Sequence, residues 1–166
     1  MPTFALTPDV SLELDEPVAR RLYRRMHEHF AGQDTRTSDA AILDDNHPLW
    51  ERHSGRSGQT GPEWSAQDAD LAEAFYAQLR GKGRLFFDLL LEVPGRQLTV
   101  DDLIAESGGA FTSSFSIAGA INGLRKPHEA SGRRYPFYWW EGTPSRYAVK
   151  PSVAALFNAA RRKVTV

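Results

Sequence analysis

The chain has 166 residues, which suits one domain with an extension, and its 41% hydrophobic and 25% charged residues are typical of a globular protein. No stretch approaches the ~18 consecutive apolar residues that a membrane span requires, so we expect no membrane partner. The N-terminal residues lack the basic and apolar regions of a signal peptide, and the chain contains no cysteine. These features exclude disulfides, thiolate metal sites and a cysteine nucleophile, and they favour a cytoplasmic location.

The net charge of −1 at pH 7 conceals opposite charges in the two halves of the chain. Residues 1–79 contain seven Lys or Arg and fourteen Asp or Glu, whereas residues 80–166 contain thirteen and seven. This asymmetry has two interpretations. Either the basic half contacts nucleic acid, or the two halves attract each other and pack together.

The first part of the chain predicts one strand, one helix and a long connection. Residues 10–14 alternate apolar and polar side chains, as a half-buried strand does, and residues 16–30 repeat apolar side chains at helical spacing. We therefore assign residues 1–31 to an N-terminal strand–helix unit. Residues 32–63 have no such period and predict a long loop or linker. Four apolar side chains are expected to hold part of this loop against the core: Ile42, Leu43, Leu49 and Trp50.

Residues 64–166 predict a domain made mainly of helices. Helical spacing covers residues 66–80, and residues 84–93 are apolar on nearly every side, which is typical of a central helix. A short strand is expected at residues 96–98. Thr99 is well placed to cap the helix that follows it.

The run from Leu98 to Lys126 predicts a short helix, a turn and a second helix, which we expect to span residues 113–126. A helix in the major groove of DNA needs small residues, hydroxyl or amide groups for base edges, and cations toward its ends. The expected core side of this helix consists of Ile117, Ala118, Ile121 and Leu124. The expected outer side consists of Ser113, Ser116, Gly119, Ala120, Asn122, Gly123, Arg125 and Lys126.

Three features of this helix indicate contacts with DNA. Asn122 is suited to an adenine edge, and Ser113 and Ser114 at the helix start are suited to a phosphate. Gly119 and Gly123 lie four residues apart on one face, although each costs ~1 kcal/mol relative to alanine inside a helix. We expect a close approach at that face, either by the DNA backbone or by another helix of this protein.

Residues 133–149 predict a β-hairpin with three arginines near its base, Arg133, Arg134 and Arg146, which are candidates for flanking phosphates. Its aromatic side chains fall on both faces. One face is expected to fill the core. The spare face, with Tyr138 and Trp140, packs on the N-terminal part of the chain, forms a homodimer interface or stacks unpaired bases.

Helix, helix, turn, helix and hairpin follow one another in the order of a winged helix-turn-helix. The predicted fold class is therefore α+β and mainly helical. It comprises a winged helix-turn-helix domain with flanking helices in residues 64–166 and an N-terminal strand–helix extension.

Three stretches carry a resemblance to known proteins: FFDLLLEVPGRQLTVDDLIAESGG, IAGAINGLRKP and PFYWWEG with RYAVKPSVAALFNAARR. The block from Leu85 to Ala160 resembles uncharacterised actinobacterial winged-helix proteins, which are often small, regulator-like proteins of streptomycetes. The resemblance implies a winged-helix fold and DNA binding. It implies no target sequence, ligand or catalytic residue.

These observations predict a DNA-binding protein that acts as a transcriptional regulator, with helix 113–126 in the major groove and hairpin 133–149 as the wing. The alternative is a winged-helix module that binds another protein and not DNA. A homodimer is plausible because two-fold symmetric proteins read palindromic sites. The candidate nucleic-acid-binding residues are Ser113, Ser114, Ser116, Asn122, Arg125, Lys126, Arg133, Arg134 and Arg146.

No nucleophile elbow, paired-carboxylate pattern or metal-ligand spacing links the serines, carboxylates and histidines of the chain. We therefore expect no enzymatic activity, no metal and no cofactor.

Overall fold

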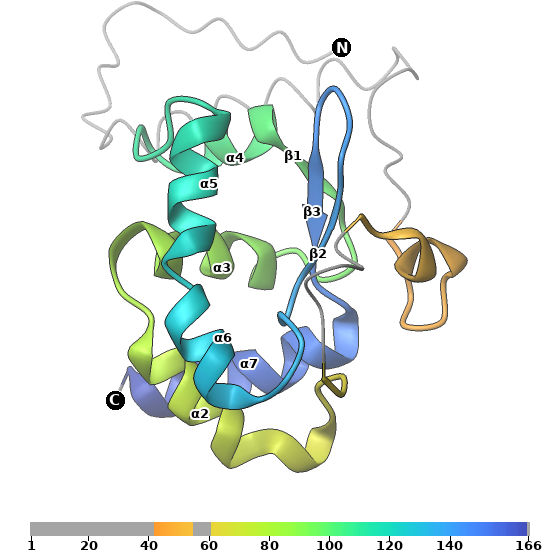
Figure 1. Cartoon of the computed structure of the whole chain (residues 1–166), viewed down its shortest axis with the longest axis vertical. Coiled ribbons are helices and arrows are strands. Elements are labelled where there is room, and N and C mark those ends of the chain that lie inside the picture. The colour runs from red at the N-terminus through yellow and green to blue at the C-terminus, as the bar shows by residue number, and fades with distance from the viewer. Residues whose placement is uncertain (1–41, 55–60, 166) are drawn as a thin grey trace, which may run out of the picture. The chain divides into compact units, whose positions relative to one another are not determined.

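The computed structural model describes residues 42–54 and 61–165 (Figure 1). They form a mainly helical α+β fold with a small three-stranded antiparallel sheet, as predicted, and the arrangement is compatible with a winged helix. The strand–helix unit predicted for residues 1–31 lies outside the described residues. The helices are η1 (Pro48–Arg52), η3 (Ala66–Asp68), α2 (Ala69–Gln78), α3 (Gly81–Leu91), α4 (Val100–Glu106), α5 (Ser114–Asn122), α6 (Arg125–Ser131) and α7 (Pro151–Val164).

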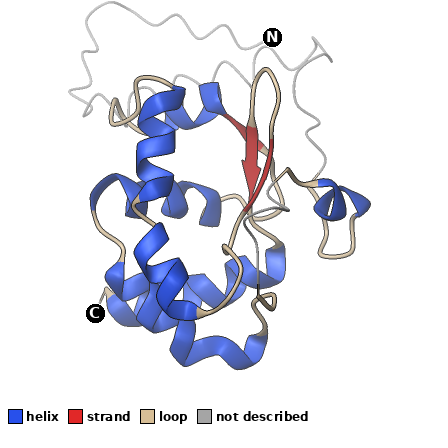
Figure 2. Cartoon of the chain, viewed as in Figure 1, coloured by secondary structure: helices blue, strands red, loops and turns tan. Residues whose placement is uncertain are grey.

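The sheet joins the hairpin to the strand that precedes α4 (Figure 2). Its strands are β1 (Leu98–Thr99), β2 (Tyr138–Trp140) and β3 (Arg146–Ala148), in the order β1-β3-β2. The strand expected at residues 96–98 is present but covers only Leu98–Thr99, and Thr99 also caps α4, as predicted. Because Pro136 has no N–H to donate to a strand ladder, the hairpin ladder is much shorter than residues 133–149.

Helix α3 is the central helix, as its apolar composition predicts. Phe86, Phe87 and Leu90 are fully buried. The ring of Phe86 lies 5.2 Å from that of Phe137 in the segment leading into β2, and the ring of Phe87 lies 5.0 Å from that of Phe157 in α7. The helix begins at Gly81, so residues 81–83, which precede the expected start at residue 84, belong to it. They form its first turn.

The prediction of one continuous helix over residues 113–126 is wrong. Helix α5 ends at Asn122, Gly123 is its C-cap, and α6 begins at Arg125. Pro127 explains the break, because it has no N–H to donate to the carbonyl of residue 123 and would interrupt a continuous helix. In the first turn of a new helix the missing N–H costs nothing, and Pro127 lies there, in α6.

The expected rotation of α5 is correct in part. Ile117 and Leu124 are fully buried, and Ile121 is half-buried, as predicted. Ala118 is exposed, however, and Ala120 is buried, so these two alanines exchange the sides we expected. The inward alanine lies at the contact with α3, where the carbonyl oxygen of Ala120 comes close to Gly83.

Residues 42–54, which we name the strap, pack against the hairpin. Leu43 and Trp50 are buried, as expected, but Ile42 is 74% exposed, so its predicted role is wrong. The ring of Trp50 lies 5.1 Å from that of Tyr138 and 5.7 Å from that of Trp140. The first interpretation of the spare aromatic face, packing on the N-terminal part of the chain, is thus confirmed.

Two backbone hydrogen bonds anchor the ends of the strap. The N–H of Leu43 donates to the carbonyl of Gly95 at 2.8 Å, and the N–H of Ser54 donates to the carbonyl of Trp139 at 2.8 Å. The second bond uses the outer side of β2, which is an edge strand of the sheet. The strap therefore covers a sheet edge that would otherwise be free to pair with another chain.

We expect Trp50→Ala to lower the free energy of unfolding by about 3–5 kcal/mol, because it leaves a cavity beneath Tyr138 and Trp140. Urea denaturation followed by circular dichroism measures the change. Ile42→Ala is the matched control, and its exposed side chain should change stability by less than ~0.5 kcal/mol. Equal effects of the two substitutions would contradict the packing described for the strap.

Candidate nucleic-acid interface

The start of α5 is stabilised by two of the predicted site residues. Ser113 is the N-cap, and its Oγ accepts a hydrogen bond from the N–H of Ser116. The Oγ of Ser116 accepts from the N–H of Thr112 at 3.0 Å and donates to the carbonyl of Ser113 at 2.7 Å. Ser113 and Ser116 thus satisfy backbone groups of their own helix. Ser114 is exposed at the same end.

One side of α5 is left uncovered by the described residues. We name it the outer face and define it by Phe115, Ala118, Gly119 and Asn122, which are exposed and spaced by three or four positions. Phe115 is 86% exposed and carries the largest apolar side chain of this face. Neither expected side of the helix includes Phe115, although its spacing of four from Gly119 is the signal that assigns it to this face.

The two glycines that were expected to share one close contact have different surroundings. A Cβ on Gly123 would lie 3.0 Å from the carbonyl oxygen of Ala120 and in van der Waals contact, at 3.6 Å, with the Cα of Gly83, so Gly123 lies where α5 packs on α3. A Cβ on Gly119 would meet nothing within 4 Å. Of the two interpretations offered for this pair, helix packing accounts for Gly123. No contact with a described residue requires glycine at position 119.

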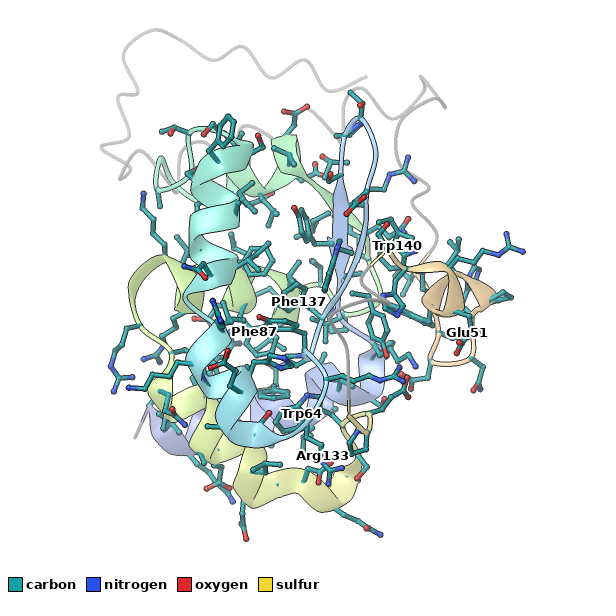
Figure 3. The ribbon with its side chains drawn as sticks, in the orientation of Figure 1. Glu51, Trp64, Phe87, Arg133, Phe137 and Trp140 are labelled. Atoms are coloured by element: carbon teal, nitrogen blue, oxygen red, sulfur yellow. The ribbon has the colours of Figure 1, made fainter. Side chains whose placement is uncertain are left out.

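Arg133 is engaged inside the protein (Figure 3). Its Nη2 lies 2.6 Å from Oδ1 of Asp68, whose side chain is only 8% exposed. Burial of Asp68 raises its pKa, but hydrogen bonds from Ser65 and Arg133 outweigh this effect and lower the pKa overall. The pair ties the segment after α6 to the start of α2.

Arg134 holds the short segment that leads into Trp64. Its Nε donates to the carbonyl of Gly61 at 2.9 Å, and its backbone N–H donates to the carbonyl of Pro62 at 3.1 Å. Its own carbonyl accepts from Nε1 of Trp64 at 2.6 Å. The guanidinium of Arg134 is thus held by its Nε beside residues 61–63, and its Nη1 faces Oε1 of Glu63 at 3.7 Å and not the outer face of α5.

The other three predicted cations point to solvent. Nε of Arg125 lies 2.8 Å from Oε1 of Glu129, but both side chains are at least 60% exposed, so this pair contributes little and opens readily. Lys126 and Arg146 are exposed and form no ion pair with any described residue. Five predicted residues thus remain accessible: Ser114, Asn122, Arg125, Lys126 and Arg146. They lie on α5, α6 and the β2–β3 hairpin; in Figure 1 the start of α5 and the loop of the hairpin lie toward the same end of the domain, whereas α6 lies toward the other end, beside α2.

The charge asymmetry is satisfied in part inside the protein. Among the described residues, four ion pairs join a cation from residues 80–165 to a carboxylate from residues 42–79. They are Arg133–Asp68, Arg134–Glu63, Lys150–Glu63 and Lys163–Glu73. The interpretation in which the two halves attract each other is therefore supported, and fewer cations are left for a phosphate backbone.

Within the described part of the chain, no three His, Asp or Glu side chains come together as metal ligands. No helix described there combines the length and the apolar surface needed to cross a membrane.

A family model matches residues 69–164, and it is described as a family of unknown function, DUF6416. The match covers more than half of the chain and includes all six α-helices of the described residues. No curated protein and no solved structure matches the chain.

We expect Arg133→Ala to lower the free energy of unfolding at pH 7 by about 2 kcal/mol, less than for a fully buried pair because Arg133 is partly exposed. Folding lowers the pKa of Asp68, so the pair stabilises the protein above pH ~4 and is lost as the pH falls through the folded-state pKa. Urea denaturation at several pH values should show a shallower loss of stability in acid for the variant. Arg162→Ala, an exposed change in α7, is the control. A variant as stable as the control would contradict this assignment.

Proposed function

The chain belongs to the DUF6416 family of unknown function, and from the geometry of α5 we propose that it binds double-stranded DNA as a transcriptional regulator. The observation that carries the proposal is the outer face of α5. This face is uncovered by described residues, lacks charge, and has a glycine at its centre that no contact with a described residue requires.

Gly119 suits a face that lies close to another molecule. A glycine inside a helix costs ~1 kcal/mol relative to alanine, and the space around Gly119 would accommodate a methyl group. A duplex lying against Ala118 and Gly119 accounts for that cost. Asn122 would then offer its amide to an adenine edge, and Phe115 would contact a thymine methyl group.

The phosphate contacts that we propose are fewer than the sequence predicted. Arg125, Lys126 and Arg146 supply the cations, and Ser114 lies at the exposed start of α5. We leave out Arg133 and Arg134 because each is engaged with residues 61–68. Ser113 and Ser116 act in this proposal only by shaping the start of the helix.

Three phosphate contacts give a weak complex on their own. With about three phosphates neutralised, the logarithm of the DNA-binding constant would fall with the logarithm of the salt concentration at a slope of about −2.7. A complex of this kind has a low affinity at physiological salt. Two copies of the protein on a palindromic site would double the number of phosphate contacts. We therefore include a homodimer in the proposal, with two copies of α5 about 34 Å apart along the duplex.

One observation favours a second function, in which the outer face binds another protein. Phe115 is 86% exposed, and the outer face carries no cation. Aromatic residues with few charges around them are enriched in the centres of protein interfaces. This alternative predicts strong loss of partner binding in Phe115→Ala and little dependence on salt.

We expect Lys126→Ala/Arg146→Ala to weaken binding to random-sequence duplex DNA and to reduce the magnitude of the salt slope by about 2, because two phosphate contacts are lost. Fluorescence anisotropy at several salt concentrations measures both quantities. Arg162→Ala removes an exposed cation elsewhere and should leave the slope unchanged. Absence of binding at low salt by the folded protein would overturn DNA binding and favour the protein-interaction module.

We expect Gly119→Ala to raise the free energy of unfolding by about 0.5–1 kcal/mol and, at the same time, to lower the affinity for DNA. The gain arises because alanine favours the helix and its methyl group meets no other atom, and the loss arises because that methyl group separates α5 from the duplex. Gly123→Ala is the matched comparison and should destabilise the fold, because its Cβ would lie 3.0 Å from the carbonyl oxygen of Ala120. A more stable Gly119→Ala protein with unchanged DNA affinity would remove the outer face from the proposed interface.

A further inference from the structure

A cavity of about 240 Å³ lies where the strap, the hairpin and α7 meet. Its lining contains no residue of α5, so it is separate from the proposed DNA surface. Its polar residues include Asp45, Glu63, Arg134, Tyr138, Lys150 and Ser152.

Glu63 occupies this cavity loosely. The hydroxyl of Tyr138 donates to its Oε1 at 3.0 Å, but Nζ of Lys150 lies 3.5 Å from Oε2 and Nη1 of Arg134 lies 3.7 Å from Oε1. Well-formed hydrogen bonds between a cation and a carboxylate are shorter, at ~2.7–2.9 Å. The Glu63 side chain is itself about half exposed, so the protein's own carboxylate only partly fills its position between these groups.

The ammonium group of Lys150 has hydrogen-bond donors that its neighbours in the cavity satisfy only in part. Its side chain is 12% exposed, and its ammonium lies 5.2 Å from the centre of the Tyr138 ring. Glu63 is its ion-pair partner, at 3.5 Å. An ammonium has three donors and loses much of its hydration on burial, so a closer anion would stabilise it.

Asp45 does not supply that anion. Its Oδ1 accepts from the N–H of Ser152 at 3.0 Å and from the hydroxyl of Ser152 at 2.8 Å, and so it caps the start of α7. With Asp45 engaged in this way, Glu63 faces two cations, Arg134 and Lys150. The charges of Asp45 and Glu63 balance those of Arg134 and Lys150, so an anion can pair closely with the two cations only by displacing Glu63.

The rest of the lining is aromatic or apolar. Trp64, Tyr135, Pro136 and Val153 contribute to the wall. Burial, followed by the charge of Glu63, raises the pKa of Tyr138, so its hydroxyl remains a hydrogen-bond donor at neutral pH. The volume is below the ~300–1,000 Å³ of pockets for drug-sized ligands, which limits the ligand to a small molecule.

We propose that this cavity binds a small organic carboxylate, whose anionic group replaces Glu63 between Arg134 and Lys150 and whose apolar part lies against Trp64 and Tyr135. Such a ligand would contact the strap, the segment entering β2 and the start of α7 together. Its binding does not depend on the proposed function of α5.

Isothermal titration calorimetry with benzoate on the full-length protein tests this site, and benzyl alcohol serves as an uncharged aromatic probe of similar size. We expect benzoate to bind and benzyl alcohol not to bind. Glu63→Gln should bind benzoate several-fold more tightly, because the competing charge is removed while the hydrogen bond from Tyr138 is kept. Lys150→Met should weaken binding by about tenfold or more.

The opposite directions of these two changes separate a binding site from a loss of folding, because an unfolded variant cannot bind more tightly. Arg162→Gln is the control, since it removes an exposed cation of α7 outside the cavity. Absence of heat from benzoate in both wild type and Glu63→Gln would overturn the proposal. Equal binding of benzyl alcohol, or of inorganic phosphate, would overturn the assignment to organic carboxylates.

Discussion

Helix α5 lies against α3 through a close contact at Gly83, which Gly123 faces from the end of α5. A Cβ on Gly83 would lie 3.1 Å from the carbonyl oxygen of Ala120, and a Cβ on Gly123 would lie 3.6 Å from the Cα of Gly83. This approach determines which side of α5 is buried, because it turns Ala120 inward. The opposite side, from Phe115 to Asn122, is then exposed, and every proposal about recognition depends on that rotation. The break between the two helices follows this contact directly, since α6 begins at Arg125 with Pro127 in its first turn.

The order of the elements, the central position of α3 and the capping role of Thr99 were predictable, because each depends on local spacing or composition. The rotation of α5 was not fully predictable. Ala118 and Ala120 are chemically identical, and only the position of α3 distinguishes them. Pro127 indicates a break soon after Asn122. The apolar spacing of Ile117, Ile121 and Leu124 continues to the break, however, and predicts one continuous helix.

The candidate site was predicted less well than the fold, and the reason is long-range pairing. A sequence shows that Arg133 and Arg134 are cations next to an aromatic strand, but it does not show that Asp68 and residues 61–63 lie beside them. Their partners are more than sixty positions away in the chain. The two arginines therefore act as structural links between the two halves of the chain. The proposed DNA surface is correspondingly small, which is why a second copy belongs to the proposal.

The contact between Gly95 and the strap links two parts of the chain that the family model treats differently. Gly95 has φ +76°, a conformation that asparagine also tolerates, but any Cβ there would lie 2.4 Å from the carbonyl oxygen of Leu43. The matched region begins at residue 69 and so includes Gly95 but not the strap. The backbone conformation at position 95 alone would allow asparagine in relatives. A strap packed against this position allows only glycine. The residue that a relative carries at position 95 therefore indicates whether its hairpin edge is covered by its own chain or left free to pair with another.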